Sequence, residues 1–433
     1  MIYRRLNINL TQYCDQQITI FSNFAFKKSI NSKPNFLVMK KYLFILLVLS
    51  LFLTSCENEI GFTEQNSSRG SFQITPQEAA QIASCSAISY STRSKNVEAE
   101  NVLSISFSEV DSTAQEANQP LMYVVNYKQG GYALVPADKR VSTPILALID
   151  NGQFNDKVKK NFLFQFIAKD IENYIRNEIA VYQDSQDQDY RIIYTSIKEY
   201  QNVVDTLIKT QWTEGAPFNN YCQVSGTKKR AKAGCAAIAT GQIFAYYKYP
   251  AKYNGHDYLW NEILSGEKQP TTEKGKTAAA YLISDIGRLD KTRYGVRSSA
   301  TNVTDVKNAL NTMGYNYTYE QNPLSFVMYV NVLRSHPVLI SATEENKEIG
   351  HIWVIDGYAD GIRYKQYEDY NTGEIVKTEK EVLPLVHCNW GWGGQGNGYY
   401  LFNVFDMQYK DPHKTRATYN SNISAYVNIS PKK

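Results

Sequence analysis

The 433-residue sequence has few cysteines and few histidines. Its six cysteines show no CxxC spacing, so a metal cluster is not indicated, although disulfides are possible. Five histidines leave few candidates for an imidazole-dependent site. Glycine (24) and proline (13) are too sparse for a collagen-like or low-complexity chain. The composition predicts a globular protein, and the length allows two or three domains.

An excess of positive charge is also absent from most of the chain. There are 46 Lys and Arg residues against 42 Asp and Glu, but seven of the basic residues and one acid fall within residues 1–55. The remainder holds 39 basic and 41 acidic residues. Because nucleic-acid binding needs a basic surface, we do not expect a nucleic-acid partner.

The N-terminal hydrophobic run is too short to span a bilayer. Two lysines and about a dozen apolar residues end in Leu53-Thr-Ser-Cys56, which resembles a bacterial lipobox. We expect a lipoprotein signal peptide over residues 39–55 and lipid on Cys56, with an ordinary signal peptide as the alternative. Residues 1–38 are interpreted as a misannotated extension.

Export places the protein in the bacterial cell envelope. The lipid on Cys56 would be its only attachment to the membrane, and the polar residues 56–69 would serve as a tether. The sequence leaves open whether the protein faces the periplasm or the outside, and whether it is released after processing.

A small α+β domain is predicted for residues 70–182. Thr75 is a predicted helix cap, followed by proline at the first helical position and Glu78 at the third. Residues 102–150 alternate like an antiparallel sheet, and residues 157–182 have helical periodicity.

A polar linker at residues 183–206 and a larger domain at residues 207–433 follow. The linker is the predicted maturation site, because exposed polar segments are where proteolysis concentrates. The first half of the larger domain contains a predicted helix and the second half is rich in strands, so we expect an α+β fold with the site between the halves. Residues 366–380 are a predicted surface hairpin beside the site.

Cys235 is the candidate nucleophile. It follows Gly234 and precedes small helix-forming residues, which predicts a helix start, where amide groups stabilise a thiolate. Taken alone, such a cysteine is more often a small buried hydrophobic residue.

An imidazole partner for Cys235 is offered by His351 or His387. His351 lies between Gly350 and an apolar strand that would hold it rigidly. His387 competes, because strand alternation places it on the same face as Asn389.

The segment Asn389–Gly394 could support the histidine. The Asn389 amide can accept the second ring proton, and the Trp390 indole can cover that bond from water. A glycine-rich hairpin with two aromatic core residues is the alternative.

Three segments in order, Gly234–Ile243, Gly350–Gly357 and Asn389–Gly394, resemble the streptopain family of papain-like cysteine peptidases. The likeness covers about residues 200–430. Residues 70–182 are similar to the propeptide of these secreted zymogens.

The resemblance implies a papain-like, two-part α+β catalytic domain that hydrolyses polypeptides without a cofactor. It assigns Cys235 as nucleophile and His351 as general acid and base, supported by Asn389 and Trp390.

One position departs from the family pattern. Glu214 stands where a glutamine is expected to hold the oxyanion, and an ionised carboxylate cannot donate that hydrogen bond. Either Glu214 is protonated, or Gln211 substitutes, or the backbone N–H of Cys235 acts largely alone. A catalytically weak homologue that works as a peptidase inhibitor or surface-binding protein is therefore the alternative function.

Overall fold

The computed structural model describes residues 72–87, 97–110, 118–184, 190–343, 350–404 and 423–432. The predicted extension, signal peptide, tether and lipidated Cys56 lie outside these residues. Within the described ranges, no helix is long and apolar enough to cross a membrane.

The first described helix, α3 (Pro76–Ser86), begins as the sequence predicts. The Thr75 hydroxyl accepts a hydrogen bond from the Glu78 N–H at 3.2 Å, and the Glu78 carboxylate accepts one from the Thr75 N–H at 2.7 Å. This reciprocal pair satisfies two backbone donors that a helix start leaves free.

Antiparallel strands and a long helix make up the rest of the N-terminal part, which confirms the predicted α+β pattern. The strands are β1 (Ala99–Ser106), β2 (Pro120–Tyr127), β3 (Tyr132–Pro136) and β4 (Ala147–Ile149). The helices after α3 are α4 (Phe107–Val110), α5 (Asp156–Lys159) and α6 (Phe162–Asp184). Helix α6 covers the apolar periodicity predicted over residues 157–182.

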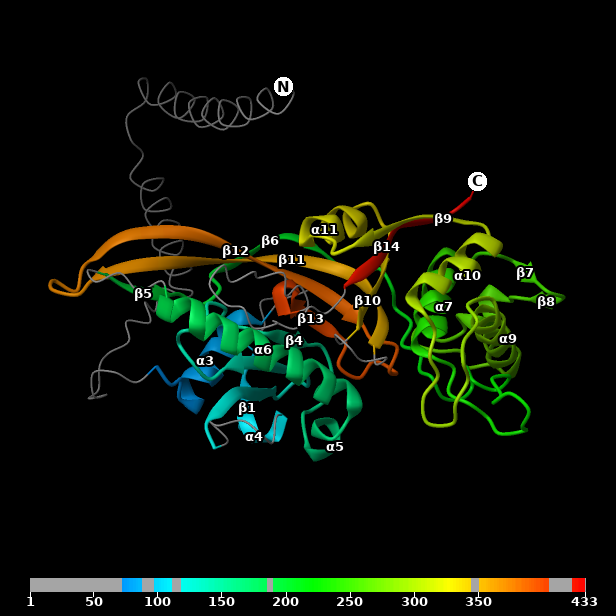
Figure 1. The fold of residues 1–433 in the computed structure, drawn as a ribbon, viewed down its shortest axis with the longest axis horizontal. Coiled ribbons are helices and arrows are strands. Elements are labelled where there is room, and N and C mark those ends of the chain that lie inside the picture. The colour runs from blue at the N-terminus through cyan, green and yellow to red at the C-terminus, as the bar shows by residue number, and fades with distance from the viewer. Residues whose placement is uncertain are drawn as a thin grey trace, which may run out of the picture. The chain divides into compact units, whose positions relative to one another are not determined.

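The helical half of the larger part lies at one end of the molecule in Figure 1. Its helices are α7 (Cys235–Tyr247), α8 (Trp260–Ile263), α9 (Glu273–Leu289), η1 (Val303–Asp305) and α10 (Lys307–Thr312), with the small pair β7 (Lys252–Tyr253) and β8 (His256–Asp257). Helix α7 is buried on nearly every side, because it carries alanine, glycine and isoleucine rather than one apolar stripe.

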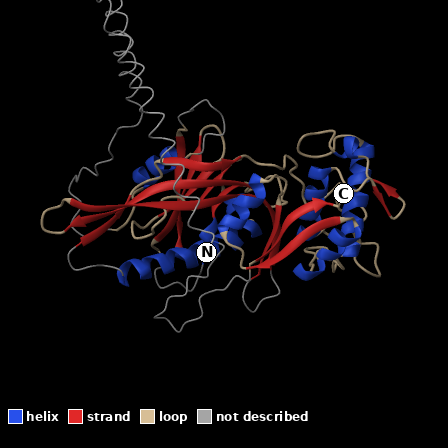
Figure 2. Cartoon of the chain, turned by 90° about the horizontal axis from the view of Figure 1, so that it is seen from above, coloured by secondary structure: helices blue, strands red, loops and turns tan. Residues whose placement is uncertain are grey.

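The strand-rich half follows, as expected. Its elements are β9 (Tyr315–Gln321), α11 (Ser325–Leu333), β10 (Val338–Thr343), β11 (Gly350–Asp369), β12 (Ile375–Asn389), β13 (Gly398–Leu401), η2 (Phe402–Val404) and β14 (Ser424–Pro431). Figure 2 shows these strands as broad ribbons with helices beside them.

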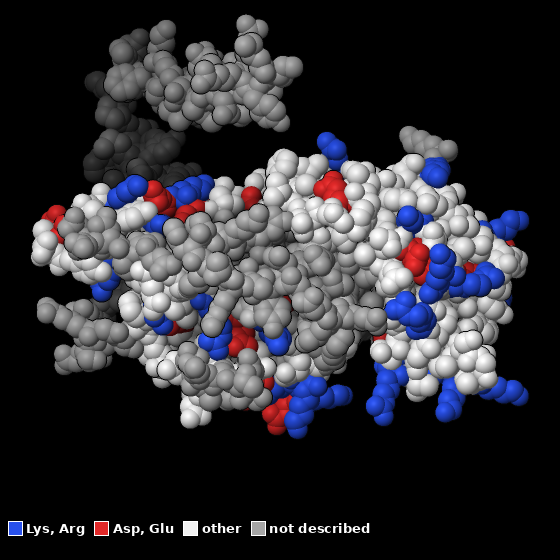
Figure 3. Space-filling view, in the orientation of Figure 1, with Lys and Arg blue, Asp and Glu red and all other residues white. Residues whose placement is uncertain are grey.

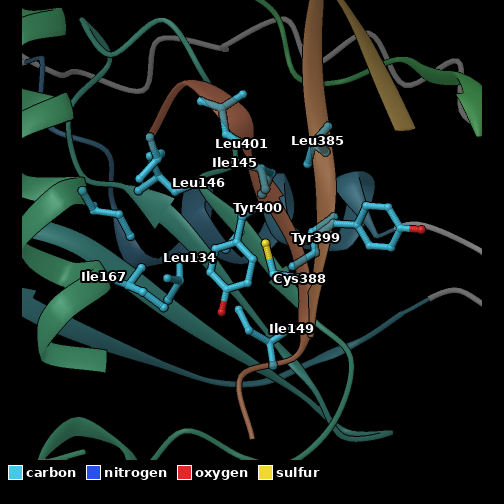
Figure 4. Close-up of a cluster of buried hydrophobic side chains, with 14 of the residues drawn as sticks. Leu134, Ile145, Leu146, Ile149, Ile167, Leu385, Cys388, Tyr399, Tyr400 and Leu401 are labelled. Atoms are coloured by element: carbon cyan, nitrogen blue, oxygen red, sulfur yellow. The ribbon is translucent and has the colours of Figure 1, made fainter. Parts of the chain in front are cut away.

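A single sheet runs through both parts of the chain. Its order is β1-β2-β3-β4-β13-β12-β11-β10-β14-β9, so β4 of the N-terminal part pairs with β13 of the larger part. Side chains from the two parts pack together at this joint, as Figure 4 shows for Leu134 and Ile167 on one side and Leu385 and Tyr400 on the other. The N-terminal part is therefore built into the core of the larger part.

Strand β11 separates two hydrophobic cores. Trp353 and Ile355 pack into the core that includes the N-terminal part, whereas Ile352 and Val354 pack into the core around α7. This division follows from the alternation of side chains along a strand. It sets which face of the sheet each site residue occupies.

The predicted linker contains two strands. β5 (Tyr190–Tyr194) and β6 (Glu199–Val204) both pair antiparallel with β11. Only part of residues 183–206 is therefore available as an extended loop, because backbone pairing to β11 holds residues 190–194 and 199–204.

The predicted hairpin at residues 366–380 is confirmed, but it does not lie beside the site. It is the distal part of β11 and β12, joined by a turn near Asn371. Gln366 is 15 residues along the strand from His351, which corresponds to about 50 Å of strand at roughly 3.3 Å per residue. Figure 1 shows the hairpin tip at the end of the molecule opposite to α7.

Candidate active site

Cys235 is the first residue of α7, as predicted. Gly234 before it has φ 90°, a backbone conformation that L side chains rarely adopt. The backbone N–H groups of Ile352 and Ala236 hydrogen-bond to the thiol and lower its pKa, but burial and the nearby Glu214 carboxylate outweigh them and raise that pKa to about 12. The thiol is therefore protonated at neutral pH.

His351 lies near the start of β11 and is buried among tryptophans. Its ring stacks with Trp353 and Trp390, with ring centroids 5.9 Å apart in each case. Burial lowers the pKa of His351 to about 4, although its hydrogen bond to the Trp390 carbonyl opposes this shift. The imidazole is neutral at neutral pH.

The hydrogen bond to Trp390 fixes the tautomer of His351. Nε2 lies 3.0 Å from the Trp390 carbonyl oxygen, which can only accept. Nε2 must therefore carry the proton, and the lone pair is left on Nδ1, where a general base needs it.

Cys235 and His351 are far apart in sequence, and no hydrogen bond joins them among the described residues. The thiol bonds to the backbone of Ile352, the next residue after His351. The His351 ring lies with Trp353 on the opposite face of β11. The described state thus holds a neutral thiol and a neutral imidazole rather than an ion pair.

The Asn389 amide does not accept the imidazole proton, in contrast to the sequence prediction. It donates to the Thr210 carbonyl at 2.8 Å and accepts from the Gly391 N–H at 3.3 Å. The Trp390 carbonyl takes the predicted role of Asn389. Asn389 pairs with Val354 in the ladder, so it faces α7 instead of the His351 ring.

Gln242 is a site residue that the sequence did not reveal. It is fully buried on α7, and its Oε1 accepts from the Trp212 N–H and the Thr210 hydroxyl, both at 3.1 Å. Its Nε2 donates to Asn389 Oδ1 at 3.2 Å. Gln242 thereby joins the helix of Cys235 to the strand that leads into Trp390. No local pattern marks such a residue, since its partners lie far away in sequence.

Of the residues considered for the oxyanion, Glu214 rather than Gln211 lies beside the nucleophile. Glu214 interacts electrostatically with Cys235, which places it at the nucleophile. Burial raises the pKa of Glu214, while Lys232 opposes the rise. The side chain of Gln211 instead packs against Gly394, where a Cβ would collide with it.

His387 occupies a separate position between two carboxylates. Its Nδ1 lies 2.6 Å from Asp356, and its Nε2 lies 2.9 Å from Asp150 of the N-terminal part. Burial lowers its pKa, but Asp356 and Asp150 prevail and raise that pKa to about 10. A histidine held charged in this way is poorly suited as a general base, which favours His351.

Comparison with known proteins finds two family matches along the chain, one in the N-terminal part and one in the larger part. Residues 212–400 match the Peptidase C10 family, and residues 71–175 match the family described as Spi protease inhibitor. The protein is a cysteine-type peptidase.

The relatives of this peptidase are proteases. Streptopain from Streptococcus pyogenes is 27% identical over 72% of this chain and 81% of its own length. The thiol protease/hemagglutinin PrtT of Porphyromonas gingivalis is 23% identical over 51% of this chain and 26% of its own length. A fragment of prointerpain A from Prevotella intermedia shares the fold, with a TM-score of 0.52 and 21% identity over 73% of this chain and 98% of the fragment. The chain is a cysteine protease zymogen with a propeptide.

The propeptide of the zymogen contacts the loop that holds His351. The Asp150 N–H donates to the Asn397 carbonyl at 3.0 Å, and the Asn397 side chain accepts from the Trp390 N–H at 3.1 Å. The Trp390 carbonyl in turn accepts from His351. Two hydrogen-bonded residues therefore connect the propeptide to the imidazole.

Proposed function

We propose that this peptidase cleaves internal peptide bonds through Cys235 and His351. The observation that carries the proposal is their placement on α7 and β11, which pack directly on each other and bring the thiol to the backbone beside the histidine. The tautomer of His351 supports it, because Nδ1 is free to take a proton.

In the first step, His351 Nδ1 takes the proton of Cys235, and the thiolate attacks the scissile carbonyl carbon. The resulting imidazolium protonates the leaving amine as the C–N bond breaks, which leaves a thioester on Cys235. Water then gives a proton to His351 and attacks the thioester, and the thiol leaves with that proton. The first step requires the ring and the thiol to move within hydrogen-bond distance, so the described state corresponds to the latent form.

The negative oxygen of the tetrahedral intermediate needs donors. The backbone N–H of Cys235 supplies one at the start of α7, and the carboxyl of Glu214, whose pKa burial raises, supplies another in its protonated form. Neutral Glu214 avoids placing a second negative charge beside the oxyanion.

Export and anchoring are part of the same proposal. The signal at residues 39–55 and the lipid on Cys56 would hold the zymogen at the cell envelope. Labelling cells with radioactive palmitate would test the lipid: Cys56→Ser protein should lose the label, and a label retained in that variant would contradict the anchor.

Thiol-dependent cleavage of casein by the purified, processed protein tests the peptidase mechanism. Cys235→Ser and His351→Ala should each abolish turnover, since the first removes the thiolate and the second its base. Cys222→Ser is the control, because Cys222 is another cysteine that the processed protein retains, and it is buried. Loss of activity in His387→Gln, with His351→Ala still active, would reverse the choice of base.

A second candidate function is inhibition of other peptidases by the N-terminal part. The match of residues 71–175 to Spi protease inhibitor favours it. Cys235→Ser zymogen that blocks another thiol protease at equimolar concentration would support this role.

A further inference from the structure

Two loops beside Cys235 are strongly basic. Segments 223–234 and 291–301 contain seven Lys or Arg residues and no Asp or Glu. We call these two segments the basic rim. Its cations are Lys228, Lys229, Arg230, Lys232, Lys291, Arg293 and Arg297.

The basic rim is fixed to the residues that precede the nucleophile. The Lys232 N–H donates to the Gly295 carbonyl at 3.0 Å, and the Ser299 hydroxyl donates to the Lys232 carbonyl at 2.7 Å. A Cβ at Gly234 would lie 3.5 Å from the Ser299 Cβ. The two loops therefore border Cys235 as one surface.

Most charges of the basic rim are exposed and unpaired. Lys228, Lys229, Arg230, Arg293 and Arg297 are exposed, and none has a carboxylate within 4.0 Å in the described part of the chain. Figure 3 shows that Lys and Arg side chains outnumber Asp and Glu on the visible face of the helical half.

The acids near the rim do not neutralise it. Lys291 pairs with Asp305 at 3.6 Å, and Lys232 faces Glu214. Asp290 is fully buried, and burial raises its pKa to about 8, so it is mostly protonated at neutral pH. A net positive field therefore remains where a bound polypeptide passes the nucleophile.

We propose that the basic rim selects polypeptide substrates with Asp or Glu close to the scissile bond. The inference rests on the proposed function of Cys235, because it assigns a substrate class to that site. An acidic polypeptide is favoured over a lipid surface or nucleic acid, since the charge is concentrated at the nucleophile of a peptidase.

The expected preference is moderate and depends on salt. Exposed charge pairs change an equilibrium constant by about 1.4- to 5-fold each, so two acidic residues should raise kcat/KM by roughly two- to twentyfold. Screening acts over about 8 Å at physiological ionic strength. The preference should therefore shrink at high salt, whereas an apolar specificity pocket would keep its preference.

The test uses processed protein and quenched fluorescent peptides of one sequence. The peptides carry Glu, Gln or Lys at single positions on either side of the scissile bond, and kcat/KM is measured at low and high salt. The variant is Arg293→Glu with Arg297→Glu. The matched control is Lys252→Glu with Lys274→Glu, which reverses two exposed charges on the same half but outside the rim.

We expect Glu peptides to be cleaved fastest by the wild type and the control, and the rim variant to lose or invert that order. Equal rates for Glu, Gln and Lys peptides, or an unchanged order in the rim variant, would overturn the inference. If the rim variant has a lowered melting temperature, Arg297→Gln alone is tested instead. It should reduce the ratio of kcat/KM between Glu and Gln peptides at least twofold. Failure of the proposed function would look different: no peptide would be cut and a thiol alkylator would not label Cys235.

Discussion

At the scale of single residues, the proposed role of Glu214 as an oxyanion donor depends on its protonation. Because burial raises its pKa, the donating acid form persists at pH values below that raised pKa and is lost above it. We predict that Glu214→Gln stays active and keeps its activity to higher pH than the wild type, since an amide remains a donor at every pH. The measurement is kcat/KM of the processed protein against pH.

Gln211→Ala is the companion variant for this prediction. Gln211 packs on Gly394, so its loss should change kcat/KM by less than a few fold. A loss in Glu214→Gln of about a hundredfold, the cost typical of removing an oxyanion donor, would contradict the role of protonated Glu214.

Gln242 is predicted to position the site without touching substrate. Gln242→Leu should remove one of the hydrogen bonds to Asn389 and leave the buried Thr210 hydroxyl and Trp212 N–H without their acceptor, at a cost of about 1 to 3 kcal/mol in the free energy of unfolding for each unsatisfied group. We expect kcat to fall with KM nearly unchanged, because the Trp390 carbonyl and the His351 ring lose their fixed orientation.

Thr240→Val is the matched control for Gln242. Thr240 lies on the same helix, and its buried hydroxyl has no hydrogen-bond partner among the described residues. Its kcat and melting temperature should stay near wild type. If Gln242→Leu lowered the melting temperature but kept kcat at a temperature where it is folded, the role would be structural only.

The sequence predicts Cys235 and His351 as site residues, because a glycine before each and apolar residues after each are local signals. The true acceptor of the imidazole proton was not predictable. A backbone carbonyl carries no sequence signature. Whether the Asn389 side chain or the Trp390 carbonyl accepts the proton depends on which face of the sheet the Asn389 side chain occupies.

At the scale of elements, the joint between β4 and β13 is reinforced by one ion pair. Charged His387 links Asp356 of the peptidase to Asp150 of the propeptide. We predict that Asp150→Asn weakens retention of the propeptide after the linker is cut, by roughly tenfold in Kd, because charged His387 then loses one of its two carboxylate partners. Size-exclusion chromatography of the nicked protein measures it.

Glu98→Gln is the control for Asp150→Asn, since Glu98 pairs with Lys128 on an exposed surface. It should retain the propeptide like the wild type. Equal retention by the wild type, Asp150→Asn and Glu98→Gln would contradict the prediction. It would show that the β4–β13 pairing and the hydrophobic core around it hold the propeptide without the ion pair.

The same ion pair predicts a pH dependence. His387 has its pKa raised from 6.5 to about 10 in the folded state, so the stabilisation is fully present below about pH 6.5 and is lost as pH rises through 10. The free energy of unfolding of the zymogen should therefore decrease between about pH 6.5 and pH 10, and His387→Gln should remove that decrease. A flat wild-type profile would contradict the linkage.

Several regular elements could be predicted from the sequence, whereas others, such as α9, α11 and β9, were not. The capped helix α3 and the apolar strands β10, β11 and β14 have clear local signals. Strands β5 and β6 were missed because neither has a regular alternation of apolar and polar residues, and their strand structure comes from pairing with β11.

At the scale of the whole molecule, maturation should occur at residues 183–206. We predict that incubation of the wild type releases a C-terminal fragment that begins in this window, outside β5 and β6, because strand pairing protects their backbone. N-terminal sequencing identifies the cut.

Cys235→Ser zymogen should stay full length unless another protease is added. A zymogen that is fully active without cleavage would contradict latency but leave the peptidase assignment intact. A first cut deep within residues 210–430 would contradict the predicted window.

The continuous sheet has a consequence for the mature enzyme. When β4 departs with the propeptide, the backbone of β13 loses its neighbour, and Gly398–Leu401 becomes an open edge. The unpaired N–H and C=O groups of such an edge can hydrogen-bond to another strand. Tyr399 and Tyr400, which are buried in the zymogen, would become more exposed to solvent. Activation therefore exposes a strand edge of four residues on the enzyme, where an extended polypeptide can add as a further strand.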